Sequence, residues 1–463
     1  MFLEFYGAAG QVTGSLHRLN VNHNDVLLEC GLFQGHRVEA HHLNRAAPDW
    51  AIKAECVVLS HAHLDHSGNL PSLTRKGFKG NIYCTPATRD LCSVMLRDSA
   101  MIQQQDARYL QKKGDRGTPV EPLYDVEDAQ QAVSQMVTVS PHRTLTIARG
   151  VDLTFHDAGH VLGSSLVQLD LMEQGKRFRL LFTGDLGRAA LPLLKSPEII
   201  SDVDLLLMES TYGDRLHGDY NNIDEQLEAI VNKTIGRGGR VYIPTFALER
   251  AQEVLFVLER LHEEGRLPDV PIYIDSPLAI AITEIYKLHP ESLAPTIRDR
   301  IVERNDPFSP PGLKYVSNVQ HSIALQRSGE PCIVIAGSGM CEGGRIVHHL
   351  QGGLEDRRNS VVIVGFMAQH TLGRRLVERR DRVRVLGVER DVLAEVHVLN
   401  GLSAHADKDD LIDFTRATAK IGNVRRVALI HGEDDARDAL AEALREIGVP
   451  RVLTPQKGDI EQL

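Results

Sequence analysis

The sequence predicts an α/β protein in which one domain is interrupted by another. Up to about residue 210, short β-rich segments alternate with turns, and two helical stretches break them. From about residue 212 the chain changes to repeated strand–loop–helix units, which predict a parallel and mostly buried sheet. We therefore expect residues 209–391 to form a domain inserted between the two parts of another, residues 1–208 and 392–463.

In the first part, the expected elements follow from β-rich or alternating segments and from helical spacing. Predicted strands cover residues 3–6, 12–20, 26–28, 57–60, 82–85, 153–156, 166–171 and 178–183. Helices are expected over residues 88–105, where long-chain residues recur at helical spacing, and from residue 124, where acidic residues occupy the first turn.

The insert and the C-terminal part show the strand–helix alternation more clearly. Strands at 241–246, 272–277, 333–340 and 361–365 are each followed by a predicted helix, over 248–261, 278–288, 345–350 and 371–377. Two further strands, 396–399 and 426–430, have a helix between them and another after the second.

Length, charge and cysteine content narrow the class of protein. A chain of 463 residues is too long for one ordinary domain, and its net charge of −10 gives no support for a broad basic surface that binds nucleic acid non-specifically. A local basic groove is compatible with that charge. No signal peptide and no run of the ~18 apolar residues needed for a membrane helix is present, so we expect a cytoplasmic protein. The six cysteines form no C-x-x-C pair and are predicted to be buried free thiols.

Four potential metal ligands crowd into one short segment directly after the apolar run Cys56-Val-Val-Leu59. They are His61, His63, Asp65 and His66. Desolvating three imidazoles and a carboxylate together does not stabilise a fold. A pair of divalent cations would give each of them a use, so this segment predicts a metal site.

Three later strands each end in another ligand type. These residues are His160, Asp185 and His431. In layered α/β folds ligands gather at the carboxyl ends of strands, so all three can converge on the first segment. Any one of these histidines alone would be better explained by local packing or capping.

Seven imidazole and carboxylate ligands suit zinc but are too many for one tetrahedral ion. They suit two Zn²⁺ ions that share Asp185 and a bridging hydroxide. A metal lowers the pKa of its bound water to about 7, and a second ion about 3.5–4 Å away clamps the attacking and leaving oxygens. The pattern therefore predicts hydrolysis of a phosphodiester.

The segment His61-Ala-His-Leu-Asp-His66 resembles the signature of the metallo-β-lactamase superfamily, with Gly159-His160 and Gly184-Asp185 in the expected order. Glu209-Ser-Thr-Tyr-Gly-Asp-Arg215, Leu402-Ser-Ala-His-Ala-Asp407 and Leu429-Ile-His-Gly-Glu433 are similar to motifs A, B and C of a narrower group, the β-CASP nucleases. Segments of that group's inserted domain are matched by Pro244–Arg250, Asp275–Pro277, Gly337–Met340 and Gly365–Gly373. The resemblance covers essentially the whole chain.

This resemblance implies a metallo-β-lactamase αββα sandwich with an inserted parallel-sheet α/β (β-CASP) domain. It implies one zinc held by His61, His63, His160 and Asp185, and a second held by Asp65, His66, Asp185 and His431. It also implies an RNA substrate, because RNA-acting members carry His at motif C. The expected activity is that of a zinc-dependent ribonuclease, endo- or exonucleolytic or both, in RNA processing or decay.

Three residues are expected to carry the chemistry besides the metals: Asp65, Glu209 and His405. His405 would protonate the leaving O3′, because expelling an alkoxide without a proton is costly and His titrates near neutral pH. Glu209 would hold that imidazole and raise its pKa by opposite charge. On residue chemistry alone, an acid at a helix N-terminus and a capping histidine explain these two residues equally well.

Other expectations concern support of the site, substrate and assembly. The acid before Cys30 is Glu29, where the family usually carries an Asp that supports the metal-binding loop without binding metal. Four residues after strand ends of the insert are candidates for phosphate contacts, although surface positions explain each one separately: Ser338, Arg345, Arg374 and Arg375. An even number of subunits, such as a homodimer, is the commonest outcome for such proteins.

Two rival functions fit part of the pattern. A thioesterase-like small-molecule hydrolase of the same superfamily would share the metal ligands but would not need the α/β insert. A catalytically inactive scaffold of an RNA-processing complex would typically have lost metal ligands, whereas all seven are present in this chain.

Overall fold

The computed structural model describes residues 1–35, 37–113, 121–189, 191–218 and 220–463. The chain forms two compact units, residues 1–216 with 405–463 (unit 1) and residues 217–404 (unit 2). The domain boundaries after residues 208 and 391 stay a prediction. Among the described residues, every helix is too short or too polar to cross a bilayer.

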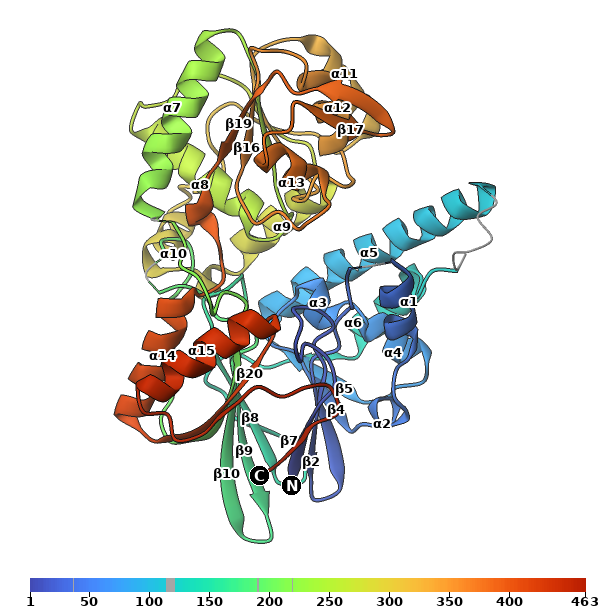
Figure 1. Ribbon diagram of the computed structural model, residues 1–463, viewed down its shortest axis with the longest axis vertical. Helices are drawn as coiled ribbons and strands as arrows, with labels where there is room; N and C mark the ends of the chain where they lie inside the picture. The colour runs from blue at the N-terminus through green and yellow to red at the C-terminus, as the bar shows by residue number, and fades with distance from the viewer. Residues whose placement is uncertain (36, 114–120, 190, 219) are drawn as a thin grey trace. The chain divides into compact units, whose positions relative to one another are not determined.

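Within its described residues, unit 1 contains two seven-stranded sheets. The first has the order β22-β1-β2-β3-β4-β5-β6, with strands β1 (Phe2–Phe5), β2 (His17–Val21), β3 (Asn24–Leu28), β4 (Cys56–Val58), β5 (Asn81–Cys84), β6 (Met136–Thr138) and β22 (Ile460–Gln462). The second has the order β21-β20-β11-β10-β9-β8-β7, with strands β7 (Leu145–Ala148), β8 (Val151–Asp157), β9 (Ser165–Glu173), β10 (Lys176–Phe182), β11 (Val203–Glu209), β20 (Val424–Ile430) and β21 (Val452–Leu453). Because β1 pairs with β22, the two chain ends lie side by side (Figure 1).

The pleat of the strands builds the layers of unit 1. Leu205 and Leu207 of β11 belong to the core between the two sheets, together with Leu3 and Leu19 of the first sheet. Leu206 and Met208, which alternate with them along β11, face the opposite side, because successive side chains of a strand point to opposite faces. There they pack with helices α14 (Lys408–Ile421) and α15 (Asp434–Glu446).

The remaining helices of unit 1 follow strands of the first sheet. They are α1 (Arg37–Arg45), α2 (Asp49–Ile52), α3 (Leu64–Ser67), α4 (Leu70–Arg75), α5 (Pro86–Lys113) and α6 (Val126–Ser134). With α14 and α15 over the second sheet, these helices complete a helix–sheet–sheet–helix sandwich, so the predicted αββα architecture is confirmed.

Unit 2 contains, within the described residues, a six-stranded sheet of order β14-β13-β15-β12-β16-β19. All its strand pairs are parallel, which confirms the predicted parallel sheet. Its strands are β12 (Val241–Pro244), β13 (Ile272–Ile274), β14 (Leu313–Tyr315), β15 (Ile333–Ala336), β16 (Ser360–Ile363) and β19 (Glu395–Val398), and a separate hairpin joins β17 (Arg382–Val385) to β18 (Val388–Asp391). Its helices are α7 (Ile223–Gly236), α8 (Arg250–Glu263), α9 (Pro277–Leu288), α10 (Pro295–Val302), α11 (Val319–Ser328), α12 (Ile346–Gly353) and α13 (Leu372–Val377).

Several predicted elements differ from those observed. The strand expected over 12–20 begins only at His17, because Gly14 has a φ of +72° and its N–H bonds to Leu32 O instead of continuing a strand. The helix expected over 88–105 extends to Lys113. All six cysteines are buried and free, as predicted.

Candidate metal centre

The seven side chains predicted to bind metal come together in unit 1, at the ends of strands. They form two groups in which all the ligand atoms lie within 4.8 Å of one another: His61, His63, His160 and Asp185, and Asp65, His66 and His431. These residues follow β4, β8, β10 and β20. The strands β8, β10 and β20 run in the same direction, so their carboxyl ends share one edge of the second sheet.

The loop that carries Asp185 approaches the histidine-rich segment closely. Gly184 has a φ of +53°, and a Cβ atom there would lie 2.2 Å from Ser60 Oγ. Only glycine allows this approach, and Ser165 N also donates a hydrogen bond of 3.0 Å to Ser60 O. The two sheets are therefore held together next to the site.

In the first group, ring nitrogens face one another at close range. His63 Nδ1 lies 3.1 Å from His61 Nε2 and 3.2 Å from His160 Nε2. Asp185 Oδ2 lies 3.5 Å from His61 Nε2 and 3.6 Å from His160 Nε2. Ligand atoms about 3.3 Å apart are what Zn–N distances of about 2.0–2.1 Å give in a tetrahedral site.

The second group has similar spacings and is joined to the first by Asp185. His66 Nε2 lies 3.2 Å from His431 Nε2, which lies 3.5 Å from Asp65 Oδ2. Asp185 Oδ2 is 3.3 Å from His66 Nε2, and Asp185 Oδ1 is 3.4 Å from His431 Nδ1. One carboxylate therefore faces imidazoles of both groups.

The donor set fits zinc. Nitrogen lone pairs that converge without protons between them are stabilised by a cation, and imidazole with carboxylate is a common zinc donor set. Within the described part of the chain, Asp185 Oδ1 is buried and has no hydrogen-bond partner. A buried carboxylate oxygen in this state is costly unless a cation neutralises it.

The second nitrogen of several of these histidines contacts a neighbouring oxygen. Ser60 Oγ lies 2.9 Å from His61 Nδ1, and Thr211 Oγ1 lies 3.1 Å from His431 Nδ1. Such contacts fix the ring orientation and leave Nε2 facing the group. The sequence did not single out Ser60 or Thr211, although Ser60 directly precedes His61 and Thr211 lies two residues after Glu209.

Glu29 contacts the histidine-rich segment that follows β4. Its Oε1 accepts a hydrogen bond of 2.9 Å from Ser60 N, and its Oε2 lies 3.5 Å from His66 Nδ1. The side chain is fully buried and its backbone has a φ of +69°. In this chain, therefore, the longer acid reaches both the loop and a histidine.

His405 and Glu209 form a pair at the edge of the two groups. His405 Nδ1 lies 3.1 Å from both carboxylate oxygens of Glu209, and His405 Nε2 lies 3.9 Å from Asp185 Oδ2. Glu209 is the last residue of β11 rather than the first of a helix, and its Oε1 also accepts a bond from Leu186 N. The cap of α14 is Asp407, not His405.

Burial and charge set the protonation states of the metal-free site. Burial lowers the pKa of His63 to about 4 despite the opposing effect of nearby carboxylates. Burial opposes ionisation of Asp65, but His66 and His431 lower the pKa of that carboxyl to about 2. For His405, burial lowers the pKa, but Glu209 and Asp185 outweigh it and raise the pKa to about 9. The site therefore contains ionised carboxylates, a neutral imidazole and a protonated one.

The four residues predicted to contact substrate lie in unit 2, and each of them makes a hydrogen bond within the protein. Arg345 donates to Asp275 Oδ1 at 2.6 Å and to Val316 O at 2.8 Å. Arg374 donates to Glu378, the residue that follows its helix, and Arg375 donates to the backbone carbonyl of His370. Ser338 Oγ accepts a bond from Gly343 N at 3.3 Å. Their role in binding substrate stays a prediction.

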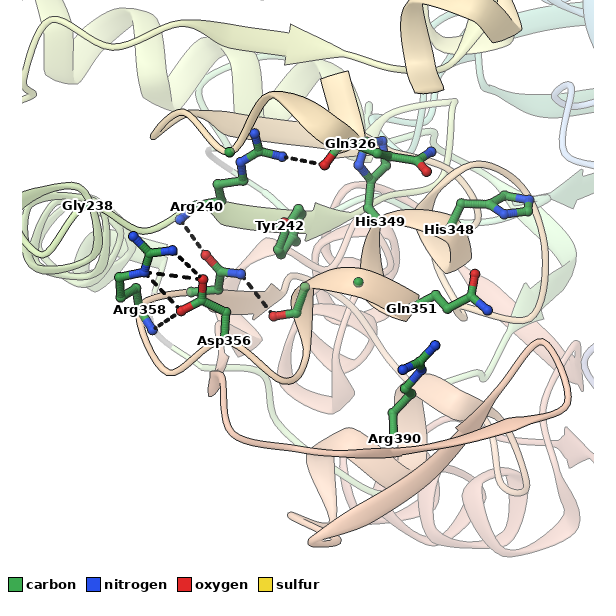
Figure 2. Close-up of a pocket in the computed structure, with 14 residues that line it drawn as sticks. Gly238, Arg240, Tyr242, Gln326, His348, His349, Gln351, Asp356, Arg358 and Arg390 are labelled. Atoms are coloured by element: carbon green, nitrogen blue, oxygen red, sulfur yellow. Dashed lines mark hydrogen bonds and ion pairs between the residues drawn. The ribbon is translucent and has the colours of Figure 1, made fainter. Parts of the chain in front are cut away.

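A pocket of about 460 Å³ lies elsewhere on unit 2 (Figure 2). Its lining includes Arg240, Arg358 and Asn359, which immediately precede β12 and β16, so it opens at the amino ends of the parallel strands. Asp356 bonds to Arg358 within it. Among the residues that line this pocket there is no predicted metal ligand and no predicted substrate contact.

Comparison with protein-family models gives three matches in sequence order. Residues 18–176 match a metallo-beta-lactamase superfamily domain, residues 251–376 a Beta-Casp domain, and residues 389–455 a Zn-dependent metallo-hydrolase RNA specificity domain. Together these matches span both parts of unit 1 and most of unit 2.

Similar proteins agree with the family models. The chain is 38% identical over 440 residues to ribonuclease TTHA0252 of Thermus thermophilus, covering 95% of each chain. It is 30% identical to transcription termination factor FttA of Methanocaldococcus jannaschii, covering 99% of this chain and 71% of that protein. A solved structure of a protein of unknown function from Enterococcus faecalis V583 has the same fold, with a TM-score of 0.54 at 13% identity over 100% of this chain and 99% of that chain. The chain therefore belongs to the β-CASP metallo-β-lactamase family of RNA nucleases, which are Zn-dependent metallo-hydrolases.

Proposed function

We propose that this protein is a ribonuclease that hydrolyses RNA phosphodiester bonds with two Zn²⁺ ions per chain. His61, His63, His160 and Asp185 would hold one ion, and Asp65, His66, Asp185 and His431 the other. The observation that carries the proposal is the position of Asp185, whose Oδ2 lies 3.3–3.6 Å from the Nε2 atoms of His61 and His160 in one group and of His66 in the other. The match to an RNA specificity domain favours RNA as the substrate.

When bound, the zinc ions supply electrostatic stabilisation of the phosphoryl oxygens and lower the pKa of the attacking water. The chain's own groups do the rest. Asp65 is ionised and only part-buried, so its carboxylate can also accept a hydrogen bond from that water. His405 is paired with Glu209 and its side chain is 21% exposed, so in its protonated form it can reach a bound substrate and donate a proton to the leaving O3′.

Glu209 positions His405 for this transfer. Both of its oxygens lie 3.1 Å from His405 Nδ1, so the carboxylate holds the ring with Nε2 directed towards Asp185. Its negative charge also keeps the imidazole protonated between turnovers. Glu209 itself is held by Leu186 N and, through its own N–H, by Thr183 Oγ1.

Substrate binding is assigned to unit 2 on a chemical argument. Ser338, Arg345, Arg374 and Arg375 carry hydroxyl or guanidinium groups that suit phosphates. We propose that they hold the RNA backbone, that cleavage is endonucleolytic, exonucleolytic or both, and that it serves RNA processing or decay in the cytoplasm. A homodimer is the assembly we propose.

The experiment is cleavage of end-labelled RNA and matched DNA by the zinc-loaded protein, run on one sequencing gel. Internal fragments or mononucleotides from RNA alone are expected, and a chelator should abolish both. Turnover of a thioester without cleavage of RNA would favour the small-molecule hydrolase. Absence of both activities, with zinc present, would favour the inactive scaffold.

A further inference from the structure

A second set of metal-ligating side chains lies in unit 1, apart from the seven residues of the candidate metal centre. His142, His156 and Glu198 offer ligand atoms that all lie within 4.8 Å of one another. His142 follows β6 in a turn, His156 lies on β8, and Glu198 lies in the segment between β10 and β11. Neither the sequence motifs nor the proposed function uses these residues.

Hydrogen bonds of the backbone and of side chains hold the three residues in place without any metal. His142 N donates to Phe155 O at 2.8 Å, and Thr144 Oγ1 lies 2.9 Å from Thr154 Oγ1, so this turn is bound to β8. Glu198 N donates to Asp157 O at 3.0 Å, and Asp157 N donates back to Glu198 Oε1 at 3.0 Å. These bonds hold His142 and Glu198 next to His156, so the three side chains are positioned before any ion binds.

The tautomer of His156 follows from its other neighbours. Gln168 Nε2 donates to Asp170 Oδ2 at 2.7 Å, so Gln168 Oε1 is the atom that faces His156 Nε2, at 3.0 Å. An amide oxygen accepts, so His156 Nε2 carries a proton. In the neutral ring His156 Nδ1 is then unprotonated, and it points at Glu198 Oε2, 3.7 Å away.

A nitrogen lone pair that faces a carboxylate oxygen is stabilised by a cation placed between them. The cation is either a proton on His156 or a metal ion. A metal is favoured by the third donor, because His142 Nε2 lies 2.8 Å and 3.0 Å from the two oxygens of Glu198, on the exposed side of the cluster. Oxygen contacts of the Asp170–Gln168–His156 kind are also what orients histidines that bind metals.

We propose that His142, His156 and Glu198 bind one divalent transition-metal ion of the zinc class, with water completing the coordination. Two imidazoles and one carboxylate suit zinc, whereas magnesium and calcium prefer oxygen ligands only. The exposed side of His142 leaves the open position that a water ligand needs.

The ion would brace a loop of the candidate metal centre. His156 and Asp157 end β8, and the same loop continues to His160. Gly159 packs against the segment that carries Glu198, since a Cβ atom there would lie 2.6 Å from Lys195 O and 3.0 Å from Pro197 Cδ. Lys195 Nζ also pairs with Asp157 Oδ2 at 2.9 Å. Binding of the ion would link the end of β8 to the segment that carries Glu198, and both of these border the loop of His160.

The experiment counts zinc and needs no measurement of activity. Protein stripped with a chelator is equilibrated with zinc, desalted and analysed for zinc per chain by mass spectrometry. Glu198→Gln and His156→Gln should each bind one equivalent fewer than the wild type. His321→Gln, which removes an exposed histidine of unit 2, should bind the same number as the wild type.

Two further variants keep the test decisive if a buried change harms folding. His142→Gly suits the left-handed backbone at that position, where φ is +63°, and should also lose one equivalent. Gln168→Leu should keep the site but weaken its zinc affinity about 10–100-fold, because the ring orientation is released. Circular dichroism verifies that each variant is folded.

Equal zinc content in the wild type, Glu198→Gln and His142→Gly would overturn the proposal. The positive charge between His156 and Glu198 would then be a proton on His156. The result is separable from the proposed function. If the two-zinc centre were wrong, the total zinc content would change, but the difference of one equivalent between the wild type and these variants would remain.

Discussion

At the scale of single residues, the site depends on which nitrogen each histidine presents. His61 and His431 present Nε2 to the metal groups because Ser60 and Thr211 occupy Nδ1, at 2.9 and 3.1 Å. A ring that was free to turn would lose this preference and would bind metal less well. The supporting oxygens therefore matter almost as much as the ligands.

Replacing Glu29 by Asp tests this support. The shorter side chain cannot reach both Ser60 N and His66 Nδ1, which Glu29 contacts at 2.9 and 3.5 Å. We expect zinc affinity to fall about 10–100-fold, measured by competition with a coloured chelator. The exposed control Glu127→Asp should leave affinity unchanged. Unchanged affinity in Glu29→Asp would mean that Glu29 serves folding alone.

Replacing Glu209 by Gln tests how His405 works. Burial lowers the pKa of His405, and the Glu209 carboxylate is the strongest influence that raises it. Without that charge the pKa falls, so His405 loses its proton at a lower pH. Because the acid must be protonated to act, we expect the alkaline limb of the kcat–pH profile to move to lower pH.

The zinc content of Glu209→Gln should equal that of the wild type, and the exposed control Glu446→Gln should leave the limb in place. If the alkaline limb of Glu209→Gln lay at the same pH as that of the wild type, Glu209 would not set the protonation of His405.

At the scale of elements, close packing of two loops sets the distance between His160 and Asp185. Gly187 N donates to Ala158 O at 2.8 Å, and a Cβ atom on Gly187 would lie 1.9 Å from Gly159 O. Gly187 also forms an isolated bridge with His405. One glycine thus brings together the loops that carry three residues of the site.

Gly187→Ala should therefore separate these loops. We expect a loss of about 1–3 kcal/mol in the free energy of unfolding, the usual cost of overpacking, together with weaker zinc binding. Chemical denaturation and zinc titration check the two effects. Gly236→Ala is the control, because a Cβ atom there meets no atom within 4 Å. Equal stability of the two variants would contradict the role assigned to Gly187.

Helices and strands could be predicted from the sequence where the residues within the element determine its type and its ends. Apolar runs such as Val241-Tyr-Ile-Pro244 and their following helices were placed correctly, since burial on both faces marks a parallel strand. The start of β2 and the end of α5 were missed. The start of β2 depends on the bond from Gly14 N to Leu32 O, and β22 pairs with β1 across almost the whole chain, so local patterns reveal neither.

At the scale of the whole molecule, the clusters of side chains that could hold a metal lie in unit 1 as far as the described residues go, and all seven predicted ligands are among them. All seven could be proposed as ligands from the sequence, because four belong to the cluster after β4 and His160, Asp185 and His431 each come shortly after the end of a strand. The supporting hydroxyls and the set His142, His156 and Glu198 could not, because only the fold brings them together.

Removal of zinc should destabilise unit 1. A ligand present at a thousandfold excess over its Kd stabilises the folded state by about 4 kcal/mol, and its loss leaves buried carboxylates such as Asp185 uncompensated. Calorimetry with and without chelator should show a lower unfolding temperature without zinc. In Asp185→Asn the chelator should have little further effect. A wild type insensitive to chelation would contradict the assignment of the ligands.

The measurement that bears most directly on the two-zinc site is the zinc content and RNA turnover of Asp185→Ala and His405→Ala, compared side by side. Asp185 faces both groups, so its loss should release zinc and abolish turnover. His405→Ala should keep the zinc content of the wild type while turnover falls about 10²–10⁴-fold, the usual contribution of a general acid. Release of zinc from His405→Ala as complete as from Asp185→Ala would contradict this division of roles.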